Sequence, residues 1–277
     1  MKCCFSSIMK TRWLGLSLSL AWVALLGSCA SHSPGGRAQN FGGTQPATGA
    51  SEDAFAVPRK DRPGLATTFG KPIKDPMPPI SFQRASSKPY GIDAIYYNDR
   101  EGLNAMGGRD VRVSGWQSTA GGVLEWGVKG AFGFLPTYKS HPGLYGYGAP
   151  RTPARRFVEG TEGGTYAIVL RNRCKCDLQV VLSVDGLDVI DGRTASVTKR
   201  GYVIPAGETL EVKGYRTGYN SVAAFRFSSV SGSYANLSRG DTRNVGVIGL
   251  AVYTPAGGDP WTWMPNEVQK RENASPF

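Results

Sequence analysis

The sequence predicts an all-β domain of the β-sandwich class, with a jelly-roll or immunoglobulin-like topology. Short runs in which apolar and polar residues alternate recur along the chain, and glycine, proline, asparagine or aspartate stands between them. No window of about 12 residues, the length of an ordinary helix, carries apolar residues at helical spacing. Many short strands separated by turn residues are typical of sandwiches.

The predicted strands either show this alternation or are apolar throughout. They are Ile92–Tyr97, Val111–Gln117, Val123–Val128, Phe132–Tyr138, Tyr166–Arg171, Leu178–Val184, Leu187–Ile190, Thr209–Tyr215, Val222–Ser228 and Val245–Tyr253. In the segment at 178–184, Leu178, Val180 and every second residue after them share one face, which indicates a half-buried strand. The last segment is apolar on both faces and predicts a central strand, in which Gly246 and Gly249 indicate a bulge or close packing.

Two segments between strands carry turn residues. Asp185-Gly186 predicts a two-residue hairpin turn, and Pro205-Ala206-Gly207 predicts a second turn that follows Tyr202–Ile204. The carboxylates of Asp185, Asp188 and Asp191 could also supply clustered oxygens to calcium, although their spacing is not that of the EF-hand loop. Since aspartate before glycine is a common turn pair, tight turns are the favoured interpretation.

Residues 1–28 have the composition of an export signal. They contain three basic residues and no acidic residue, and an apolar run extends from Trp13 to Leu26. A basic start, an apolar run of roughly 7–15 residues and small residues at the end are typical of a secretory signal. The run is short for a membrane span, which needs about 20 apolar residues.

The end of that run, Leu26-Gly27-Ser28-Cys29, resembles the lipobox of bacterial lipoproteins. The resemblance implies cleavage before Cys29 and acylation of this residue, so that the lipid bilayer becomes a partner; two or more acyl chains anchor a protein stably. Ala30, in place of aspartate, implies sorting to the outer membrane, with the periplasmic or surface side left open. The alternative is ordinary signal peptidase cleavage after Ser28 or Ala30, with Cys29 incidental.

These features divide the chain into four parts. The parts are a lipoprotein signal peptide at 1–28, a lipidated flexible linker at 29–79, a β-sandwich domain at 80–258 and a C-terminal tail at 259–277. The linker is rich in Gly, Pro, Ser, Ala and Thr, so it is expected to be a disordered tether, although its short apolar piece around Leu65 could dock on the domain. The tail contains Trp261 and Trp263 before a polar end that is expected to fray.

The chain is basic, with 32 Lys and Arg against 21 Asp and Glu and a net charge of +11. Removal of the three basic residues of the signal leaves +8 in the mature chain. A basic balance favours nucleic acid, an anionic membrane or an acidic polysaccharide as partner, and export argues against nucleic acid. The densest basic run contains Arg151, Arg155 and Arg156, which form either a solvated loop or contacts to a ligand.

The sequence contains no catalytic motif, and the protein is expected to be non-enzymatic and to use no cofactor or metal. The predicted domain has one histidine, His141, and it has no Gly-x-Ser-x-Gly elbow and no phosphate-binding or dinucleotide-binding fingerprint. Two carboxylates close in space could hydrolyse glycosides, but the sequence alone does not show which of the available glutamates lie close together. The available glutamates are Glu125, Glu159, Glu162 and Glu208.

Cys174 and Cys176 are the other cysteines of the mature chain. On a strand, residues two apart lie roughly 6.5–7 Å from each other, at or beyond the limit for a disulfide, so a bridge would require a turn. A structural zinc ion would need four ligands, and the chain has only two histidines, His32 and His141. The redox state stays open, and we expect two free thiols or a strained bridge without a role.

Several aromatic residues could either pack in the core or stack on sugars. They are Trp116, Trp126, Trp261, Trp263 and the segment Tyr145-Gly146-Tyr147. The favoured function is an envelope-anchored lipoprotein with a non-enzymatic structural or binding domain, whose partner is an envelope polysaccharide or a protein. The alternative is a carbohydrate- or peptidoglycan-binding module, with or without weak glycoside hydrolase activity. The candidate ligand contacts are Trp261, Trp263, Arg155 and Arg156.

The segment from Val181 to Val252 also resembles a family of exported bacterial proteins of unknown activity. The matching residues are Ser183–Val189, Gly201–Pro205, Ala223–Phe227, Ser233–Ala235 and Asn244–Gly249. The resemblance implies a recurrent β-domain and transfers no catalytic residue.

Overall fold

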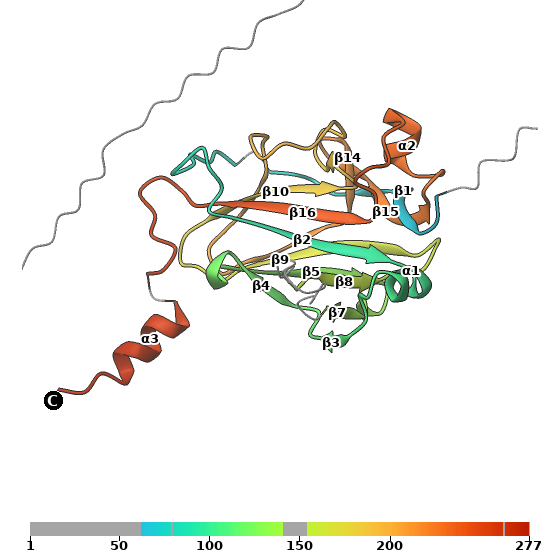
Figure 1. Ribbon diagram of the computed structural model, residues 1–277. Helices are drawn as coiled ribbons and strands as arrows, with labels where there is room; N and C mark the ends of the chain where they lie inside the picture. The colour runs from blue at the N-terminus through green and yellow to red at the C-terminus, as the bar shows by residue number, and fades with distance from the viewer. Residues whose placement is uncertain (1–61, 79, 141–153, 263, 277) are drawn as a thin grey trace, which may run out of the picture. The chain divides into compact units, whose positions relative to one another are not determined.

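The computed structural model describes residues 62–78, 80–140, 154–262 and 264–276, and within them the chain is 44% strand and 11% helix. Two multi-stranded sheets enclose one main hydrophobic core, which confirms the predicted all-β sandwich (Figure 1). No described helix is long and apolar enough to cross a membrane. The predicted signal and Cys29 lie outside the described residues.

The strands of each sheet come from distant parts of the chain. The first sheet has the order β1 (Leu65–Lys74), β15 (Ser221–Ser229), β9 (Thr165–Asn172), β5 (Leu124–Gly130) and β4 (Gln117–Thr119), with β14 (Gly214–Gly218) on β15, β13 (Thr209–Val212) on β9 and β6 (Gly133–Phe134) on β5. The second sheet has the order β11 (Leu187–Asp188), β10 (Leu178–Val184), β16 (Val247–Tyr253), β2 (Gly91–Asn98), β8 (Arg156–Glu159), β7 (Thr137–Lys139) and β3 (Val111–Val113), with β12 (Tyr202–Ile204) on β10. The pair β2–β8 is parallel.

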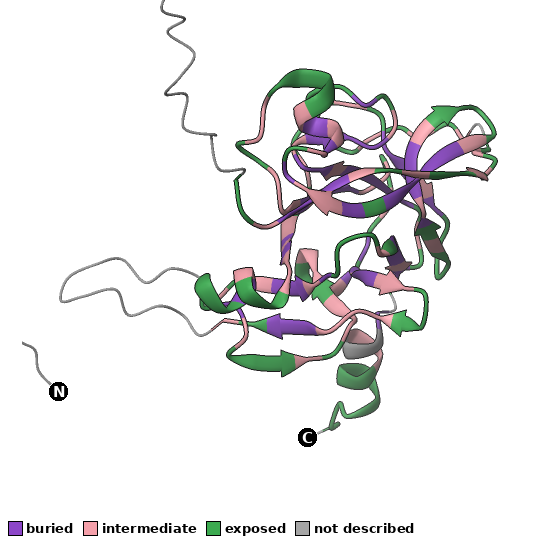
Figure 2. Cartoon of the chain, turned by 90° about the vertical axis from the view of Figure 1, so that its right-hand side faces the viewer, coloured by how far each residue is buried: buried purple, intermediate pink, exposed green. Residues whose placement is uncertain are grey.

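The core lies between the two sheets and is rich in aromatic residues. Trp126 from β5, Phe225 from β15 and Tyr97 from β2 are among its largest fully buried side chains. Along the strands, buried segments alternate with half-buried and exposed ones (Figure 2). Each aromatic side chain of this size removes about 150–250 Å² from water, so these residues supply much of the driving force for folding.

Most of the predicted strands are present. β10 has the predicted bounds, and β16 lies between β10 and β2, as expected of a central strand. The Asp185-Gly186 turn joins β10 to β11 with φ values of 54° and 78°, as in the primed hairpin turns that favour Asp-Gly. A Cβ atom at Gly249 would lie 2.8 Å from Ser183 Oγ, which confirms close packing there.

Two predicted strands are each divided between the sheets. The sequence predicts one strand over Val111–Gln117, but β3 pairs in the second sheet and β4 in the first. The segment Phe132–Tyr138 likewise contains β6 of the first sheet and β7 of the second. Gly115 lies at the first crossing, where a Cβ atom would lie 2.3 Å from the ring of Phe134. Pro136 lies at the second crossing, and proline has no N–H group to donate to a neighbouring strand.

The predicted boundary between linker and domain is wrong. Residues 65–74, which the sequence analysis places in the linker at 29–79, form β1 and pair with β15 along its length. Leu65, Ala66 and Thr67 are buried. Burial of this short apolar piece against the sheet gives a favourable free energy, which offsets the entropic cost of ordering the neighbouring residues. The sandwich therefore begins near residue 65 and not at 80.

A buried polar network fastens β1 to the core. The Asp185 carboxylate accepts hydrogen bonds from the Thr67 N–H at 2.7 Å, the Tyr97 hydroxyl at 2.6 Å and the Gly246 N–H at 2.9 Å. Thr67 Oγ1 lies 2.7 Å from the hydroxyls of both Tyr97 and Tyr166. Burial raises the pKa of Asp185 to about 6, although the donors lower it. We call these five residues the Asp185 network.

The tail predicted at 259–277 contains more structure than expected. Pro265–Glu272 forms α3, with Glu267 in its first turn and Lys270 and Arg271 in its last turn. Proline at the first position, acidic residues at the start and basic residues at the end all favour a helix. The expectation that the whole polar end frays is therefore corrected for this segment.

The other helices are α1 (Arg100–Ala105) and α2 (Tyr234–Arg239), each six residues long. Asp99 and Ser233 cap them by accepting a hydrogen bond from a backbone N–H of the first turn. Helices of fewer than two turns present no apolar stripe, so periodicity does not predict them.

Candidate functional site

The first sheet has a broad groove on the side away from the core. Its volume is about 1160 Å³, and outward side chains of β1, β5, β9, β13 and β15 line it. Four cations, Lys71, Lys129, Lys213 and Arg226, and the carboxylate of Glu211 are among the lining groups. The groove is open to solvent and larger than ordinary small-molecule pockets, which measure roughly 300–1,000 Å³. We call it the basic groove, and it suits an extended ligand.

Strand alternation places these cations on the outer face. In β15, Arg226 stands between the buried Phe225 and Phe227, and in β5, Lys129 follows the buried Val128. The sequence shows this alternation, but it does not show which strands lie side by side. The cations extend from residue 71 to residue 226 of the 277-residue chain, so the sequence alone does not bring them together.

Small residues make the groove hollow. Ala167 and Ala224 line it and are themselves buried, 8% and 5% exposed. A Cβ atom at Gly70 would lie 3.0 Å from the Ala224 carbonyl oxygen, so β1 runs close to β15 at this position. The register of β1 shifts between Phe69 and Pro72, which indicates a bulge. The bulge and the alanines leave space between the longer cationic side chains.

The fold does not neutralise the cations of the groove. Within the described part of the chain, Lys71, Lys129, Lys213 and Arg226 take part in no salt bridge. Arg226 donates a hydrogen bond through Nε to the Gly163 carbonyl oxygen at 3.1 Å, which leaves its charge uncompensated. The groove therefore attracts anions.

The arginines predicted as ligand contacts lie in the second sheet or just before it. Arg156 in β8 forms an ion pair with Asp93, lies over the ring of Trp126 at 5.5 Å, and has a side chain only 12% exposed. Burial lowers the pKa of Arg156 to about 10. This guanidinium takes part in the packing of the fold, and its role as a ligand contact stays a prediction. Arg155 is exposed and lies over the ring of Tyr96 at 5.1 Å.

The described aromatic residues do not form a broad exposed platform. Trp126 is fully buried, and Trp116 packs edge-on against Phe134 with ring centroids 5.0 Å apart. Trp261, a predicted contact, is 37% exposed and lies beside Tyr90, which is 39% exposed, at a centroid distance of 6.3 Å. A contact of Trp261 with a sugar stays a prediction.

Several predicted candidates lie outside the described residues. They are Cys29, His32, His141, Tyr145, Tyr147, Arg151 and Trp263.

Two of the candidate glutamates are paired with arginines. Glu125 lies 3.3 Å from Arg171, and Glu159 lies 3.0 Å from Arg100 and 3.2 Å from Arg109. Burial opposes the ionisation of Glu159, but its hydrogen bonds and the nearby arginines outweigh burial and hold its pKa below the ordinary value. Glycoside hydrolysis needs a carboxyl with a raised pKa as general acid, which Glu159 does not provide.

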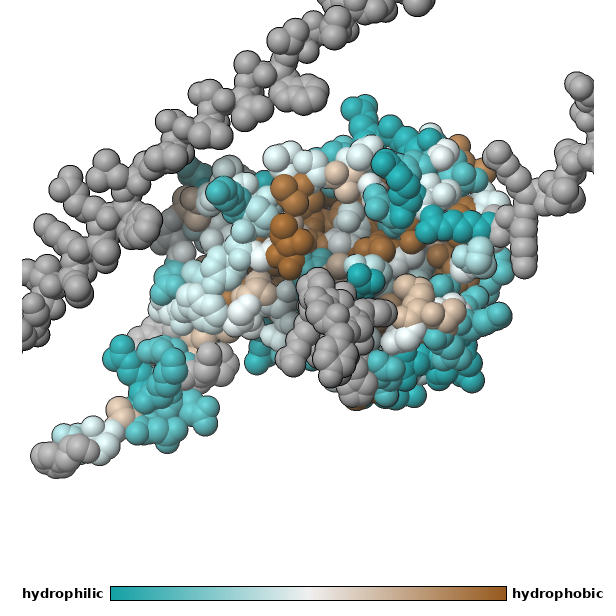
Figure 3. All heavy atoms as spheres, in the orientation of Figure 1, coloured by the Kyte–Doolittle hydropathy of each residue, from teal (hydrophilic) through white to brown (hydrophobic). Residues whose placement is uncertain are grey.

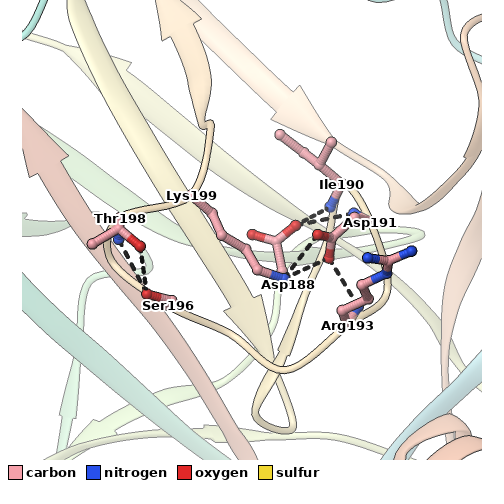
Figure 4. Close-up of polar contacts among 7 residues, drawn as sticks. All are labelled: Asp188, Ile190, Asp191, Arg193, Ser196, Thr198 and Lys199. Atoms are coloured by element: carbon pink, nitrogen blue, oxygen red, sulfur yellow. Dashed lines mark hydrogen bonds and ion pairs between the residues drawn. The ribbon is translucent and has the colours of Figure 1, made fainter.

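The aspartates after β10 shape their own loop. Asp188 accepts hydrogen bonds from the N–H groups of Ile190 and Asp191 at 2.9 and 3.0 Å, and Asp191 binds the Lys199 ammonium at 2.7 and 2.8 Å (Figure 4). These contacts confirm the tight turns predicted here. Within the described ranges, no group of three or more acidic, cysteine or histidine side chains could hold a metal ion.

The outer face of the second sheet has an apolar patch. Hydrophobic side chains gather over β10, β16 and β2 (Figure 3). A hollow of about 250 Å³ on this face is lined in part by Ile92, Val181 and Ala251, and Ile92 is 67% exposed. The two sheets thus present different chemistry to solvent, and the basic groove is the face with groups that select a ligand by charge.

Comparison with known proteins finds no relative: no family model, no curated protein and no solved structure matches the chain.

Proposed function

We propose that this protein is an envelope lipoprotein, anchored in the bilayer through acylated Cys29, whose β-sandwich is a non-enzymatic module that binds an anionic polysaccharide of the envelope. The basic groove is the observation that carries the proposal. Its lining contains four cations and one carboxylate, and none of the four cations forms a salt bridge with a residue that the structure describes.

The shape of the groove favours a polymer over a small metabolite. A volume near 1160 Å³ exceeds what a single sugar or nucleotide fills. The cations belong to four different structural segments, so a chain with repeated negative charges could contact several of them at once. Phe69, which is 41% exposed at the edge of the groove, adds a ring on which a sugar could stack.

Charge reversal in the groove should abolish most of the binding. Lys129→Glu with Lys213→Glu removes two cations and adds two carboxylates, so affinity for acidic surface polysaccharide or purified peptidoglycan should fall at least about tenfold, or about 1.4 kcal/mol. Binding of the full chain in detergent is measured by co-sedimentation at low and high salt. The unaltered protein should lose affinity as salt rises, because exposed charges are screened.

The single variants Lys129→Glu and Lys213→Glu are measured as well, and their matched control is Lys139→Glu, which exchanges one lysine for glutamate at an exposed position in β7 of the second sheet. It should leave affinity within about twofold, or roughly 0.4 kcal/mol. An equal loss in this control, or no binding to any anionic polymer, would refute the proposal.

A second candidate function is sugar binding by stacking on the Tyr90–Trp261 pair. Stacking does not depend on salt as charge attraction does. Salt-resistant binding that is lost in Trp261→Ala and retained in the charge-reversed groove would favour this alternative.

A further inference from the structure

The turn between β9 and β10 contains two thiols in contact. Cys174 and Cys176 are free, and their thiols lie close enough for each to change the pKa of the other. β9 ends at Asn172 and β10 begins at Leu178, so neither cysteine lies on a strand. The geometric objection to a bridge between residues two apart on a strand therefore does not apply here.

The side chain of Asn172 holds this turn through hydrogen bonds to its main chain. It is 1% exposed, its Oδ1 accepts a hydrogen bond from the Cys174 N–H at 2.9 Å, and its Nδ2 donates to the Cys176 carbonyl oxygen at 2.8 Å. Nδ2 also lies 3.0 Å from the carbonyl oxygens of both Ile204 and Pro205, so its two N–H groups are shared among three acceptors. One buried amide thus joins the main chain of both cysteines and fixes them to the β12–β13 turn.

The two thiols differ in access to solvent. Cys174 is 1% exposed, and its Sγ lies 3.5 Å from the Val123 carbonyl oxygen, whereas Cys176 is half-buried. An external reagent can therefore reach the sulfur of Cys176 first. The sulfur of Cys174 is already beside it, on the inner side of the turn.

We propose that Cys174 and Cys176 form a reversible disulfide by exchange with an external disulfide, with Cys176 as the attacking residue and Cys174 as the resolving residue. The Cys176 thiolate attacks one sulfur of the external disulfide, forms a mixed disulfide and releases one thiolate, which takes up the proton that Cys176 lost. The Cys174 thiol then loses its proton, and its sulfur attacks Cys176 and releases the second thiolate. Two protein thiols are oxidised, and one external disulfide is reduced to two thiols.

The surroundings of the pair make this exchange slow. Burial, together with the negative charge of Cys176, raises the pKa of Cys174 to about 12. Burial, with the carboxylates of Asp177 and Asp259, also raises the pKa of Cys176. Catalytic dithiols instead have lowered pKa values. The pair is therefore a site of oxidative modification, and it does not act as a catalyst of disulfide exchange. The inference does not depend on the proposed ligand of the basic groove.

Tryptic mapping tests the bridge directly, because trypsin cuts after Arg173, Lys175 and Arg193. The full chain in detergent is equilibrated with reduced and oxidised glutathione at several ratios, and free thiols are then blocked with N-ethylmaleimide. The protein is digested with trypsin, and the fragments are identified by mass spectrometry. A bridge holds fragments 174–175 and 176–193 together although Lys175 has been cleaved. We expect this linked species to appear as the proportion of oxidised glutathione rises and to disappear when reduced glutathione is restored.

Two single substitutions separate the roles of the cysteines. Cys174→Ser should stop at a stable glutathione adduct on Cys176, whereas Cys176→Ser should leave the buried Cys174 unmodified. Absence of the linked fragments at every glutathione ratio would overturn the proposal. Bridges from Cys176 to another chain or to Cys29, or equal reactivity of the two cysteines in the single variants, would overturn it as well. Circular dichroism verifies that each variant is folded.

Discussion

Asp185→Ala should lower the free energy of unfolding at pH 7 by roughly 3–5 kcal/mol. The substitution removes the shared acceptor of three donors of the Asp185 network: the buried N–H of Thr67, the half-buried N–H of Gly246 and the hydroxyl of Tyr97, which keeps only Thr67 Oγ1 as a neighbour in the network. Alanine also disfavours the φ of 54° at this position, at a cost of about 1 kcal/mol. Urea unfolding measures the loss, and a change below about 1 kcal/mol would contradict the role assigned to the network.

The loss of stability in Asp185→Ala should appear in β1 before it appears in the rest of the sheet. Thr67 lies in β1, and its N–H donates to Asp185 across 118 residues of sequence. Amide hydrogen exchange in Asp185→Ala should therefore lose protection first in β1. Uniform loss over both sheets would mean that the network stabilises the whole fold and not this strand in particular.

Asp185→Asn is the matched control, since asparagine has nearly the same shape and tolerates positive φ. The folded pKa of about 6 lies above the ordinary value of 3.8, so the folded protein binds the proton more tightly than the unfolded chain. The stabilisation that depends on protonation of Asp185 is therefore complete below about pH 4 and is lost as the pH rises through about 6, whereas the hydrogen bonds that its carboxylate accepts remain at pH 7. This difference corresponds to roughly 3 kcal/mol for a group that is almost fully buried.

Unfolding curves between pH 4 and pH 7 measure this linkage. The unaltered protein should gain stability relative to Asp185→Asn as the pH falls through this range, because the asparagine variant has no proton to bind at this position. If the two proteins keep a constant difference in stability from pH 4 to pH 7, the carboxyl does not titrate as described.

Cys29→Ser should move the protein out of the membrane fraction or leave its precursor unprocessed. Serine offers no thiol for acylation, and the proposed anchor depends on two or more acyl chains at this residue. Membrane fractionation of cells, with the mass of the mature chain, measures both outcomes. The expected effect is all or none, since the proposed attachment depends on acylation of this single residue.

Two substitutions control for the loss of a cysteine and for sorting. Cys174→Ser removes a thiol but should leave membrane attachment unchanged. Ala30→Asp should keep the acyl chains and, in an enteric host, retain the protein in the inner membrane. Normal maturation and membrane attachment of Cys29→Ser would refute the lipoprotein hypothesis, whatever the basic groove binds.

The sequence by itself determined the fold class and most of the strands. The alternation in Leu178–Val184 and the Asp185-Gly186 pair predict β10 and its hairpin turn, and both are present. These features are local: side chains on a strand alternate between faces, and a tight turn depends on the residues within it. The same local character explains the errors at Val111–Gln117 and Phe132–Tyr138, because alternation continues where the chain crosses between sheets.

Only the tertiary structure decided where the domain begins and where its candidate site lies. The composition around β1 resembles that of the linker before it, and the strand is held by β15 and Asp185, which lie more than 100 residues away. Lys71 and Arg226 share the basic groove for the same reason, since β1 and β15 are neighbours in the sheet. Arg155 and Arg156, adjacent in sequence, have different roles because one faces solvent and the other lies beside Asp93. Contacts between distant residues depend on strand pairing, and strand pairing is not a local property of the sequence.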